Sequence, residues 1–374
     1  MRFPEFEGEW ESKPLREVVK INQGLQIAIS ERSTENKTGS YFYITNEFLK
    51  AGSGKKYYIL NPPQSVICTE KDILMTRTGN TGQVVTNVSG AFHNNFFKVA
   101  YPEYIDKIFL YNFLKLNKTQ NQILRFAGTS TIPDLNHSDF YRIVISFPSN
   151  IEQEKISSFL SMIDERIQAQ SKIINDLKTL KTATAKKIFS QELRFKDDKG
   201  NEFLEWENIL LGDTLDYEQP TNYLVSSTEY DDSFETPVVT AGKTFILGYT
   251  DDKNGVFEKE KLPVIIFDDF TTASQFVDFP FKAKSSAMKI LKAKNDTNIR
   301  FIFEALQMIN YEVGGHGRHW ISVFSNLSIF VPSFPEQTKI ANFLSAIDSK
   351  IDMENQLLQK LEEQKKYLLQ NMFV

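Results

Sequence analysis

The sequence predicts an α+β protein in which two globular, β-rich heads alternate with two long helices as an internal repeat. Residues 147–189 align without gaps to residues 331–373 at a constant offset of 184, with 15 identities in 43 positions. Neither segment holds Gly or Pro beyond its first few residues. Short runs of β-branched and aromatic residues, punctuated by Gly, Asn and Pro, fill the rest of the chain. We therefore expect heads at 1–146 and 195–331, and spacer helices at 147–194 and 332–374.

Both copies of the repeat are expected to form long helices. Ser149-x-x-Glu152 and Ser333-x-x-Glu336 have the spacing of capping boxes, in which Ser accepts from an early backbone N–H and Glu reaches back. Apolar residues then recur at two heptad positions, which predicts a coiled-coil seam. The seam residues are Leu160, Ile163, Ile167, Ile174, Leu177 and Ile188 in the first helix, and Leu344, Ile347, Ile351, Leu358, Leu361, Leu368 and Met372 in the second.

Composition and charge exclude several classes of protein. The chain has 374 residues, 41% of them hydrophobic, and a single cysteine, Cys68, which excludes a disulfide scaffold and a cysteine-based zinc finger. No apolar run reaches the length of a membrane span and the first residues do not resemble a signal peptide, so we expect a cytoplasmic protein with no membrane association. The first head has 17 Lys and Arg against 14 Asp and Glu, and the second has 13 against 22. Net charge therefore does not settle whether the chain binds nucleic acid.

Polar loops follow the strand predicted near the centre of each head, at 72–75 and at 264–267, and a second polar segment follows each loop. Arg, Asn, Gln, Ser and Thr are side chains that read base edges in DNA, and ordinary solvent-exposed loops are the alternative. The candidate DNA contacts are Arg77, Thr78, Asn80, Thr81, Gln83, Asn94 and Asn95 in the first head, and Thr271, Thr272, Ser274, Gln275, Lys284, Ser285, Ser286 and Arg318 in the second.

Two further features refine these candidates. Arg77 is the leading base reader, because Arg can make a bidentate contact to guanine O6 and N7. A basic segment within the acidic second head predicts either phosphate contacts or a solvated face. Its members are Lys282, Lys284, Lys289, Lys292, Lys294 and Arg300.

Four local patterns resemble catalytic or metal motifs but lack residues that the chemistry needs. Asn61-Pro-Pro-Gln64 has Gln where a methyltransferase loop stacks an aromatic ring on the flipped base. Residues 52–56 lack the first Gly and the final Ser or Thr of a P-loop. His316 and His319 have no third ligand nearby in the sequence, and Asp268-Asp269 fits a turn at the end of a strand better than a Mg²⁺ site. We therefore expect no catalytic residue, no metal and no cofactor.

With these features the sequence closely resembles the specificity subunit of type I DNA restriction–modification systems. The resemblance lies in Pro148, Glu152-Gln153-x-Lys155-Ile156 and Ile163-Asp164, in their copies from Pro332 to Asp348, and in Phe189 to Phe195 leading to Trp206-Glu207. The segment from Asp72 to Gly79 is similar to a target recognition domain of that family. The resemblance spans the whole chain.

The resemblance implies that each head is a target recognition domain that reads one half of a split, asymmetric site in double-stranded DNA. The two helices would pack as an antiparallel coiled coil, set the spacing between the half-sites and dock two modification subunits, which methylate adenine with S-adenosylmethionine. Restriction subunits, which translocate and cut with ATP, would complete a system of phage defence. The chain itself would not be catalytic. A coiled-coil scaffold that binds only protein, and an autonomous DNA-modifying enzyme, are the alternatives.

Polar residues interrupt the seam at repeat-related places, with Gln170 and Lys181 in the first helix and Glu354 and Lys365 in the second. In an antiparallel pair, Lys181 can align with Glu354 while Lys365 aligns with Gln170, so that each Lys meets an acceptor. A parallel pair in the same register would place the two Lys side by side. We therefore predict an antiparallel pair with these two polar layers, and the alternative is that all four side chains extend to solvent.

Overall fold

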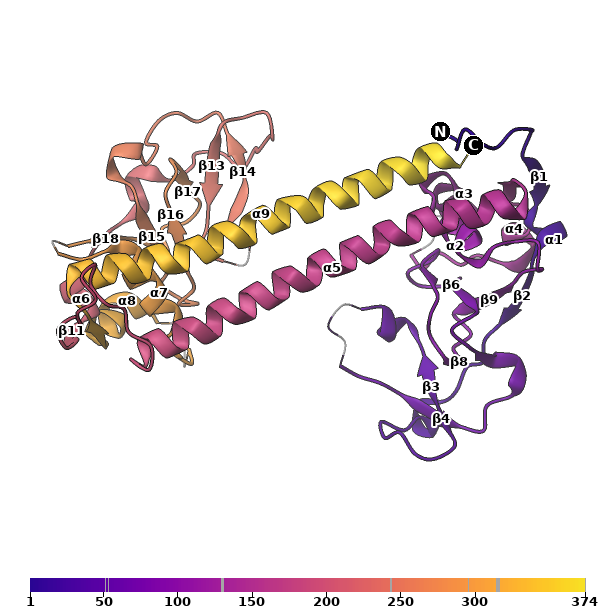
Figure 1. The fold of residues 1–374 in the computed structure, drawn as a ribbon, viewed down its shortest axis with the longest axis horizontal. Helices are drawn as coiled ribbons and strands as arrows, with labels where there is room; N and C mark the ends of the chain where they lie inside the picture. Colours follow the sequence, from indigo (N-terminus) through magenta and orange to yellow (C-terminus); the bar gives the residue numbers. More distant parts are fainter. Residues whose placement is uncertain are drawn as a thin grey trace. The chain divides into compact units, whose positions relative to one another are not determined.

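The structure is a computed structural model that describes residues 1–50, 52, 54–128, 131–242, 244–294, 296–313 and 317–373. The chain divides into two compact units, one made of Met1–Ser171 with Gln356–Val374 and the other of Lys172–Asn355. Each unit contains one head together with one end of each long helix (Figure 1). The predicted α+β class, with two β-rich heads and two long helices, is confirmed.

The head of the first unit contains two four-stranded sheets and a separate strand pair. We call the sheet with the longer strands the larger sheet and the other the smaller sheet. The larger sheet is antiparallel, in the order β2 (Lys20–Gln23), β9 (Phe96–Ala100), β6 (Ile73–Thr76) and β7 (Val84–Val85). The smaller sheet has the order β4 (Tyr58–Leu60), β3 (Ser40–Ile44), β8 (Gly90–Phe92) and β5 (Ile67–Cys68), and β1 (Glu11–Pro14) pairs with β10 (Val144–Phe147). The helices are α1 (Leu15–Val18), α2 (Lys107–Lys115), α3 (Asn117–Ala127) and α4 (His137–Phe140), with 3₁₀ turns η1 (Ile29–Glu31), η2 (Asn46–Leu49) and η3 (Gln64–Val66).

The head of the second unit is built in the same way. Its larger sheet has the order β12 (Leu215–Glu218), β18 (Met288–Ala293), β15 (Val264–Asp268) and β16 (Ser274–Val277). Its smaller sheet has the order β14 (Ile246–Thr250), β13 (Thr236–Val239) and β17 (Lys282–Ala283), and β11 (Glu207–Leu210) pairs with β19 (Ser328–Val331). The helices are α6 (Leu211–Thr214), α7 (Ile299–Gln307) and α8 (His319–Ser322), with 3₁₀ turns η4 (Pro220–Tyr223), η5 (Lys259–Lys261) and η6 (Phe324–Asn326).

The two heads therefore share one topology, which their sequences do not reveal. Both larger sheets are antiparallel, and both smaller sheets contain one parallel pair, β3 with β8 and β13 with β17. The central strand of each larger sheet, β6 or β15, is an apolar run with its first four residues buried, as expected for a strand covered on both faces. Two elements of the first head lack a counterpart among the described residues of the second. They are strand β5, which is the fourth strand of the first smaller sheet, and helix α3, which has no equivalent between α7 and α8.

The long helices are α5 (Asn150–Phe189) and α9 (Phe334–Met372), which fall within the predicted spacers. In each unit the two helices lie side by side (Figure 1), and residues early in one are buried in the same core as residues late in the other. The helices are therefore antiparallel in each unit, as predicted. In the described parts of the chain, none of the helices has the combination of length and apolar character needed to cross a membrane.

The ion pairs between the helices differ from the predicted polar layers. Lys181 Nζ lies 2.7 Å from Asp348 Oδ2 and 3.0 Å from Glu304 of α7, so the predicted partner Glu354 was wrong. Lys365 likewise pairs with Asp164, where Gln170 was predicted. Asp164 and Asp348 are related by the same offset of 184 as the two Lys, so the internal repeat produces one equivalent ion pair in each unit.

Reversing one charge of the Lys365–Asp164 pair tests whether it fixes the register of the helices. Lys365→Asp should lower the free energy of unfolding by about 1–3 kcal/mol, because it removes a charge-assisted hydrogen bond and places two carboxylates together. Adding Asp164→Lys should recover most of this loss in urea unfolding of the full chain. Lys360→Asp, at an exposed position on the same helix, is the control. A double variant no more stable than the single one would show that the pair does not couple the helices.

The two capping-box glutamates bind arginines. Glu152 accepts hydrogen bonds from Nε and Nη2 of Arg2, both at 2.7 Å. Glu336 accepts from Nη2 of Arg194 at 3.0 Å and from Nε1 of Trp206 at 3.2 Å. The expectation that both carboxylates reach back to their own helix was therefore wrong. Instead, each joins the start of a long helix to the segment that leads into a head.

Candidate nucleic-acid interface

Three chain segments meet at the end of the central strand of the first head. Arg77, the first residue after β6, donates its backbone N–H to the carbonyl of Asn95 at 2.7 Å, and its own carbonyl accepts from the N–H of Leu135 at 2.9 Å. The structure thus brings together the two predicted polar segments of this head. Sequence reasoning missed the third segment, residues 133–135, because it lies far along the chain.

Several of the predicted contacts in this loop are engaged within the head. Nη2 of Arg77 lies 2.6 Å from Oδ2 of Asp134, and the hydroxyl of Thr78 donates to the other oxygen of that carboxylate. The hydroxyl of Thr81 donates to the carbonyl of Pro133 at 2.7 Å. The side chain of Arg77 is only 17% exposed. These contacts fix the loop, and they reduce what Arg77 can offer to a base.

Of the other four predicted contacts in this head, two face solvent and two are half-buried. Asn80 and Gln83 are exposed, and their side chains form no hydrogen bond among the described residues. Asn94 donates to Gln26 Oε1 at 3.2 Å, and Asn95 is half-buried. Asn80 and Gln83 also line a hollow of about 480 Å³, together with Gly79, Thr81, Leu124, Thr131, Ile132 and Pro133.

The corresponding loop of the second head, residues 269–273, is shorter and differently held. Asp268 accepts from the backbone N–H groups of Phe270 and Thr271 at 2.9 and 2.7 Å, which confirms its expected role as a turn former. Of the predicted contacts, Thr271 and Ser286 are exposed, and Thr272 and Gln275 are half-buried. Two are engaged: Ser274 accepts from Gln307 at 2.8 Å, and Ser285 accepts from the N–H of Ala287 at 3.1 Å.

Arg318 of the second head stands where Asp134 stands in the first. His319, the next residue, donates its N–H to the carbonyl of Asp269 at 2.9 Å, as Leu135 does to Arg77. The Asp269 carboxylate also accepts from the N–H of Trp320 at 2.8 Å. Arg318 is exposed and forms no ion pair with the described residues. This segment, like residues 133–135, is thereby held at the end of the central strand.

Of the two histidines in the pattern that resembles a zinc site, the structure describes one. His319 is buried with Nδ1 at 2.9 Å from the carbonyl of Asp269, and His316 lies outside the described residues. The part of the chain that the structure describes holds no group of three His, Cys, Asp or Glu side chains placed to bind a metal ion.

The basic segment of the second head is mostly used inside the protein. Lys282 is buried and lies 2.8 Å from Asp252, and this ammonium, with the Ser226 hydroxyl, holds the pKa of the Asp252 carboxyl well below its usual range. Neither predicted interpretation, phosphate contacts or a solvated face, describes such a pairing. The other internal pairs are Lys289 with Asp269, Lys292 with Glu218, Lys294 with Asp216, and Arg300 with Asp348.

Lys284 is the exception in that segment. Its Nζ lies 5.6 Å from the centre of the Tyr230 ring, and it forms no ion pair among the described residues. Lys284 therefore remains available to a phosphate.

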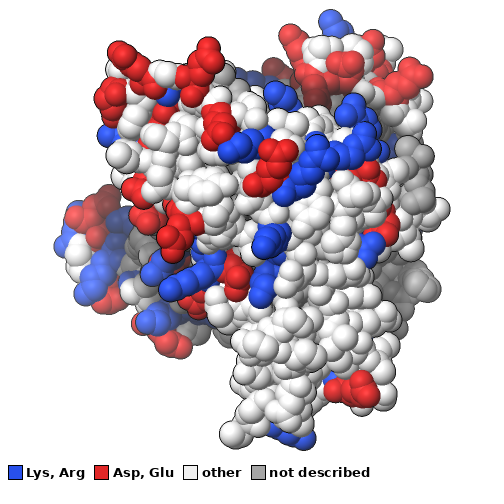
Figure 2. All heavy atoms as spheres, turned by 90° about the vertical axis from the view of Figure 1, so that its right-hand side faces the viewer, with Lys and Arg blue, Asp and Glu red and all other residues white. Residues whose placement is uncertain are grey.

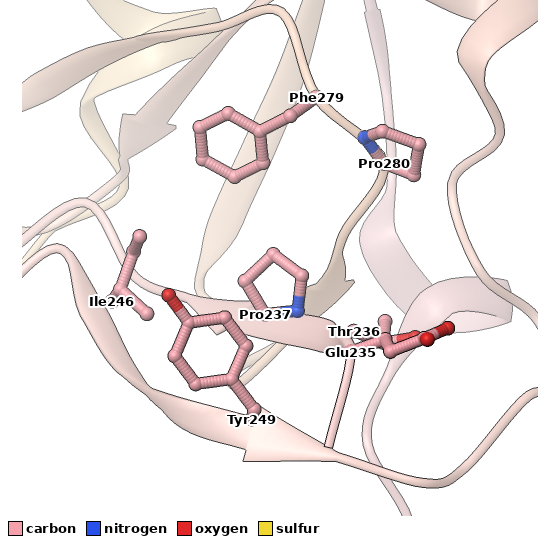
Figure 3. Close-up of a pocket in the computed structure, with 7 residues that line it drawn as sticks. All are labelled: Glu235, Thr236, Pro237, Ile246, Tyr249, Phe279 and Pro280. Atoms are coloured by element: carbon pink, nitrogen blue, oxygen red, sulfur yellow. The ribbon is translucent and has the colours of Figure 1, made fainter. Parts of the chain in front are cut away.

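A second hollow, of about 490 Å³, lies beside β13 and β14 of the second head (Figure 3). Phe279 faces Pro237 across it, with Ile246 and Tyr249 at one side and Glu235 at the other. The lining is mostly apolar, and its exposed carboxylate would repel a DNA phosphate. This hollow therefore does not belong to the candidate DNA surface.

Charge is unevenly distributed on the face drawn in Figure 2. The lobe at its lower end, which holds β3 and β4 in Figure 1, shows few charged side chains on this face. Affinity for DNA comes largely from cations that neutralise phosphates. The side of this lobe drawn in Figure 2 therefore offers little to the DNA backbone.

Comparison with known proteins gives the family. A model described as "Type I restriction modification DNA specificity domain" matches residues 7–179 and again residues 204–363. The chain is 49% identical over 133 residues to the type I restriction enzyme EcoR124I/EcoR124II specificity subunit of Escherichia coli, which covers 34% of this chain and only 32% of that protein. It is 25% identical over 409 residues to the MjaVIII specificity subunit of Methanocaldococcus jannaschii, covering 99% of this chain and 92% of that one.

Solved structures agree on the fold. The crystal structure of the S subunit of a type I restriction–modification system from M. genitalium matches with a TM-score of 0.65 at 19% identity, covering 100% of this chain and 99% of that one. A chain from a structure of a type I R-M system complex matches with a TM-score of 0.56 at 13% identity, over 99% and 98%. Since the family model covers most of the sequence in two copies, the chain belongs to the family of type I restriction modification DNA specificity domains.

Proposed function

We propose that this chain is the DNA-reading, non-catalytic subunit of a type I restriction–modification complex, and that each head binds one half of a bipartite, asymmetric site in double-stranded DNA. One observation carries the proposal beyond family membership. The two heads have the same strand order in their larger sheets, and in both a later segment donates one backbone hydrogen bond to the residue after the central strand, yet the heads present different side chains there. Asn80 and Gln83 are free in the first head, and Arg318 in the second. Such a pair of heads suits two different half-sites.

The proposed division of labour follows the predicted domains. Heads 1–146 and 195–331 act as separable target recognition domains, while spacers 147–194 and 332–374 set the gap between half-sites and dock two adenine methyltransferase subunits. Restriction subunits join this core in the cytoplasm. The modification and restriction subunits carry out the chemical reactions, and this chain determines the DNA sequence at which they act. The repeat-related ion pairs between the spacer helices support the proposal that these helices set a fixed distance between the half-sites.

The fifteen predicted polar residues remain the proposed DNA contacts, now ranked by their internal contacts. Asn80, Gln83, Ser286 and Arg318 come first, because each is exposed and its side chain has no partner among the described residues. Thr271 is exposed too, but its hydroxyl accepts from the N–H of Ala273 at 3.4 Å. Arg77, Thr78 and Thr81 come last, because their polar groups hold the loop. In a head exchanged from a relative, the DNA contacts should likewise come from exposed polar side chains that have no partner within the head.

Exchange of one head tests the proposal. Residues 195–331 would be replaced by the corresponding head of a relative, and methylated sites would be mapped in cells that also express the modification subunits. One half-site should change, while the other half-site and the spacing stay the same, because base contacts are local to each head.

Three other results would contradict the proposal. A change in both half-sites would show that the heads do not read independently. Unchanged methylation without the chain would favour a protein-binding scaffold. Methyl transfer or nicking by the purified chain alone would favour an autonomous enzyme.

A further inference from the structure

We propose that the hollow beside β7 in the first head reads an A·T pair through the major groove. In this inference the amides of Asn80 and Gln83 bind the adenine, and Leu124 contacts the thymine methyl group. The inference rests on the proposed function and adds to it the protein groups that read one A·T pair of the first half-site. It depends on which side-chain groups of the hollow are left without partners.

Among the described residues, the side-chain polar groups of the hollow that lack a partner are the amides of Asn80 and Gln83 and the hydroxyl of Thr131. A hydroxyl contacts any base, so the amides carry the specificity. A side-chain amide presents one donor and one acceptor, which match N6 and N7 of adenine, whereas guanine is bound mainly by Arg or Lys. The one nearby cation among the described residues of this loop, Arg77, is held by Asp134 and lies over the ring of Phe97 at 5.6 Å. The loop therefore offers adenine-type recognition.

Large apolar side chains stand beside these amides at the surface. Leu124 of α3 is 48% exposed and Ile132 is 62% exposed, and both line the hollow. Exposed apolar groups are costly without a function when they cluster next to a binding loop. The 5-methyl group of thymine is the apolar feature of the major groove, so this edge of the hollow matches the partner base of adenine.

The loop is rigid where its side chains are free. The N–H of Gly82 donates to the carbonyl of Thr76 at 2.8 Å, and the N–H of Gln83 donates to the Thr76 hydroxyl at 2.9 Å. Gln120 of α3 donates to the carbonyl of Gly82 at 2.8 Å. At Gly82 φ is +90°, and a Cβ there would lie 2.6 Å from the Gln120 side chain, so glycine is required. Fixed backbone positions lower the entropy cost of presenting both amides to a base.

The same recognition is not expected from the second head. Helix α3, which supplies Leu124 and Gln120, has no counterpart in the described residues between α7 and α8. The position equivalent to Asp134 there carries the unpaired Arg318. Reading of an A·T pair by amides beside α3 should therefore be confined to the first half-site, and the second head must read its own base pairs with other groups.

The experiment uses the complex of the chain with its modification subunits. Its methylation motif is mapped first, and methylation rates are then measured on duplexes in which each pair of the first half-site is varied. Asn80→Ala or Gln83→Ala should lower the preference for A·T at one position by roughly 5- to 150-fold, and leave the second half-site unchanged. Gln64→Ala, an exposed amide of the same head outside the hollow, should leave the whole motif unchanged.

Modified bases identify the contacted groups. At the affected position, 7-deazaadenine, which lacks the N7 acceptor, should reduce methylation by the unaltered complex, and should have little further effect on the amide variant. Uracil in place of thymine removes the methyl group, and Leu124→Ala should abolish the sensitivity to that change.

The inference and the proposed function fail in different ways. Absence of any sequence-specific motif would overturn both. A bipartite motif whose first half-site keeps its full preference at every A·T pair in both Asn80→Ala and Gln83→Ala would overturn the inference alone.

Discussion

Glu336→Ala is expected to lower the free energy of unfolding of the full chain by about 3–5 kcal/mol. The Glu336 carboxylate is fully buried and binds both Arg194 and Trp206. Its removal takes the buried carboxylate away from a guanidinium that is 16% exposed and keeps the Leu204 carbonyl and the exposed Glu205 as partners. It also leaves the buried indole N–H without its acceptor, which costs free energy. Urea unfolding measures the loss. Glu362→Ala, at an exposed position of the same helix, is the control and should change stability little.

The equivalent variant in the first unit should cost less. Glu152 binds Arg2 as Glu336 binds Arg194, but the indole N–H of Trp10 is already buried without a partner among the described residues. Glu152→Ala therefore removes the carboxylate from one donor side chain, Arg2, whereas Glu336→Ala removes it from two, Arg194 and Trp206. Equal losses for the two variants, or no loss for Glu336→Ala, would contradict this account.

The long helices could be predicted because their signals are local. Heptad spacing and the absence of Gly and Pro are properties of short windows of sequence. Both helices lie where these two properties predicted a helix. The partners of Lys181 and Lys365 were missed, because a pairing across two helices depends on register and on the reach of a long side chain. A usable signal was present, since Asp164 and Asp348 are among the residues that the two repeat copies share.

The common fold of the heads could not be predicted, because a sheet can be stabilised by different chemistry at the same place. Arg77 follows β6 and stacks on Phe97 of β9. At the equivalent place Asp269 follows β15 and pairs with Lys289 of β18. A cation on an aromatic ring in one head is thus replaced by an ion pair in the other, and no similarity of sequence survives. The segments that return to these loops were missed for a further reason, since long-range contacts leave no local pattern.

The Asp269–Lys289 pair is expected to be the second large contribution to stability. Both side chains are only 1% exposed, and Oδ2 of Asp269 lies 3.3 Å from Nζ of Lys289 without accepting another hydrogen bond among the described residues. Asp269→Ala should cost about 3–5 kcal/mol, because it leaves a buried ammonium unpaired. It also removes the acceptor of the Trp320 N–H, which holds the segment that carries Arg318.

A double-mutant cycle separates these two effects. In Asp269→Asn the side-chain oxygen can still accept from Trp320, but the charge is lost, so this variant should remain strongly destabilised in urea unfolding. Combining it with Lys289→Met removes both buried charges, and the double variant should be more stable than Asp269→Asn alone, since an apolar group tolerates the interior that an unpaired ammonium does not. If the double variant is instead less stable than both single variants, the ion pair is not what stabilises this end of β15. Methylation mapping with the double variant gives the functional outcome: with the Trp320 contact retained, the half-site of the second head should remain unchanged.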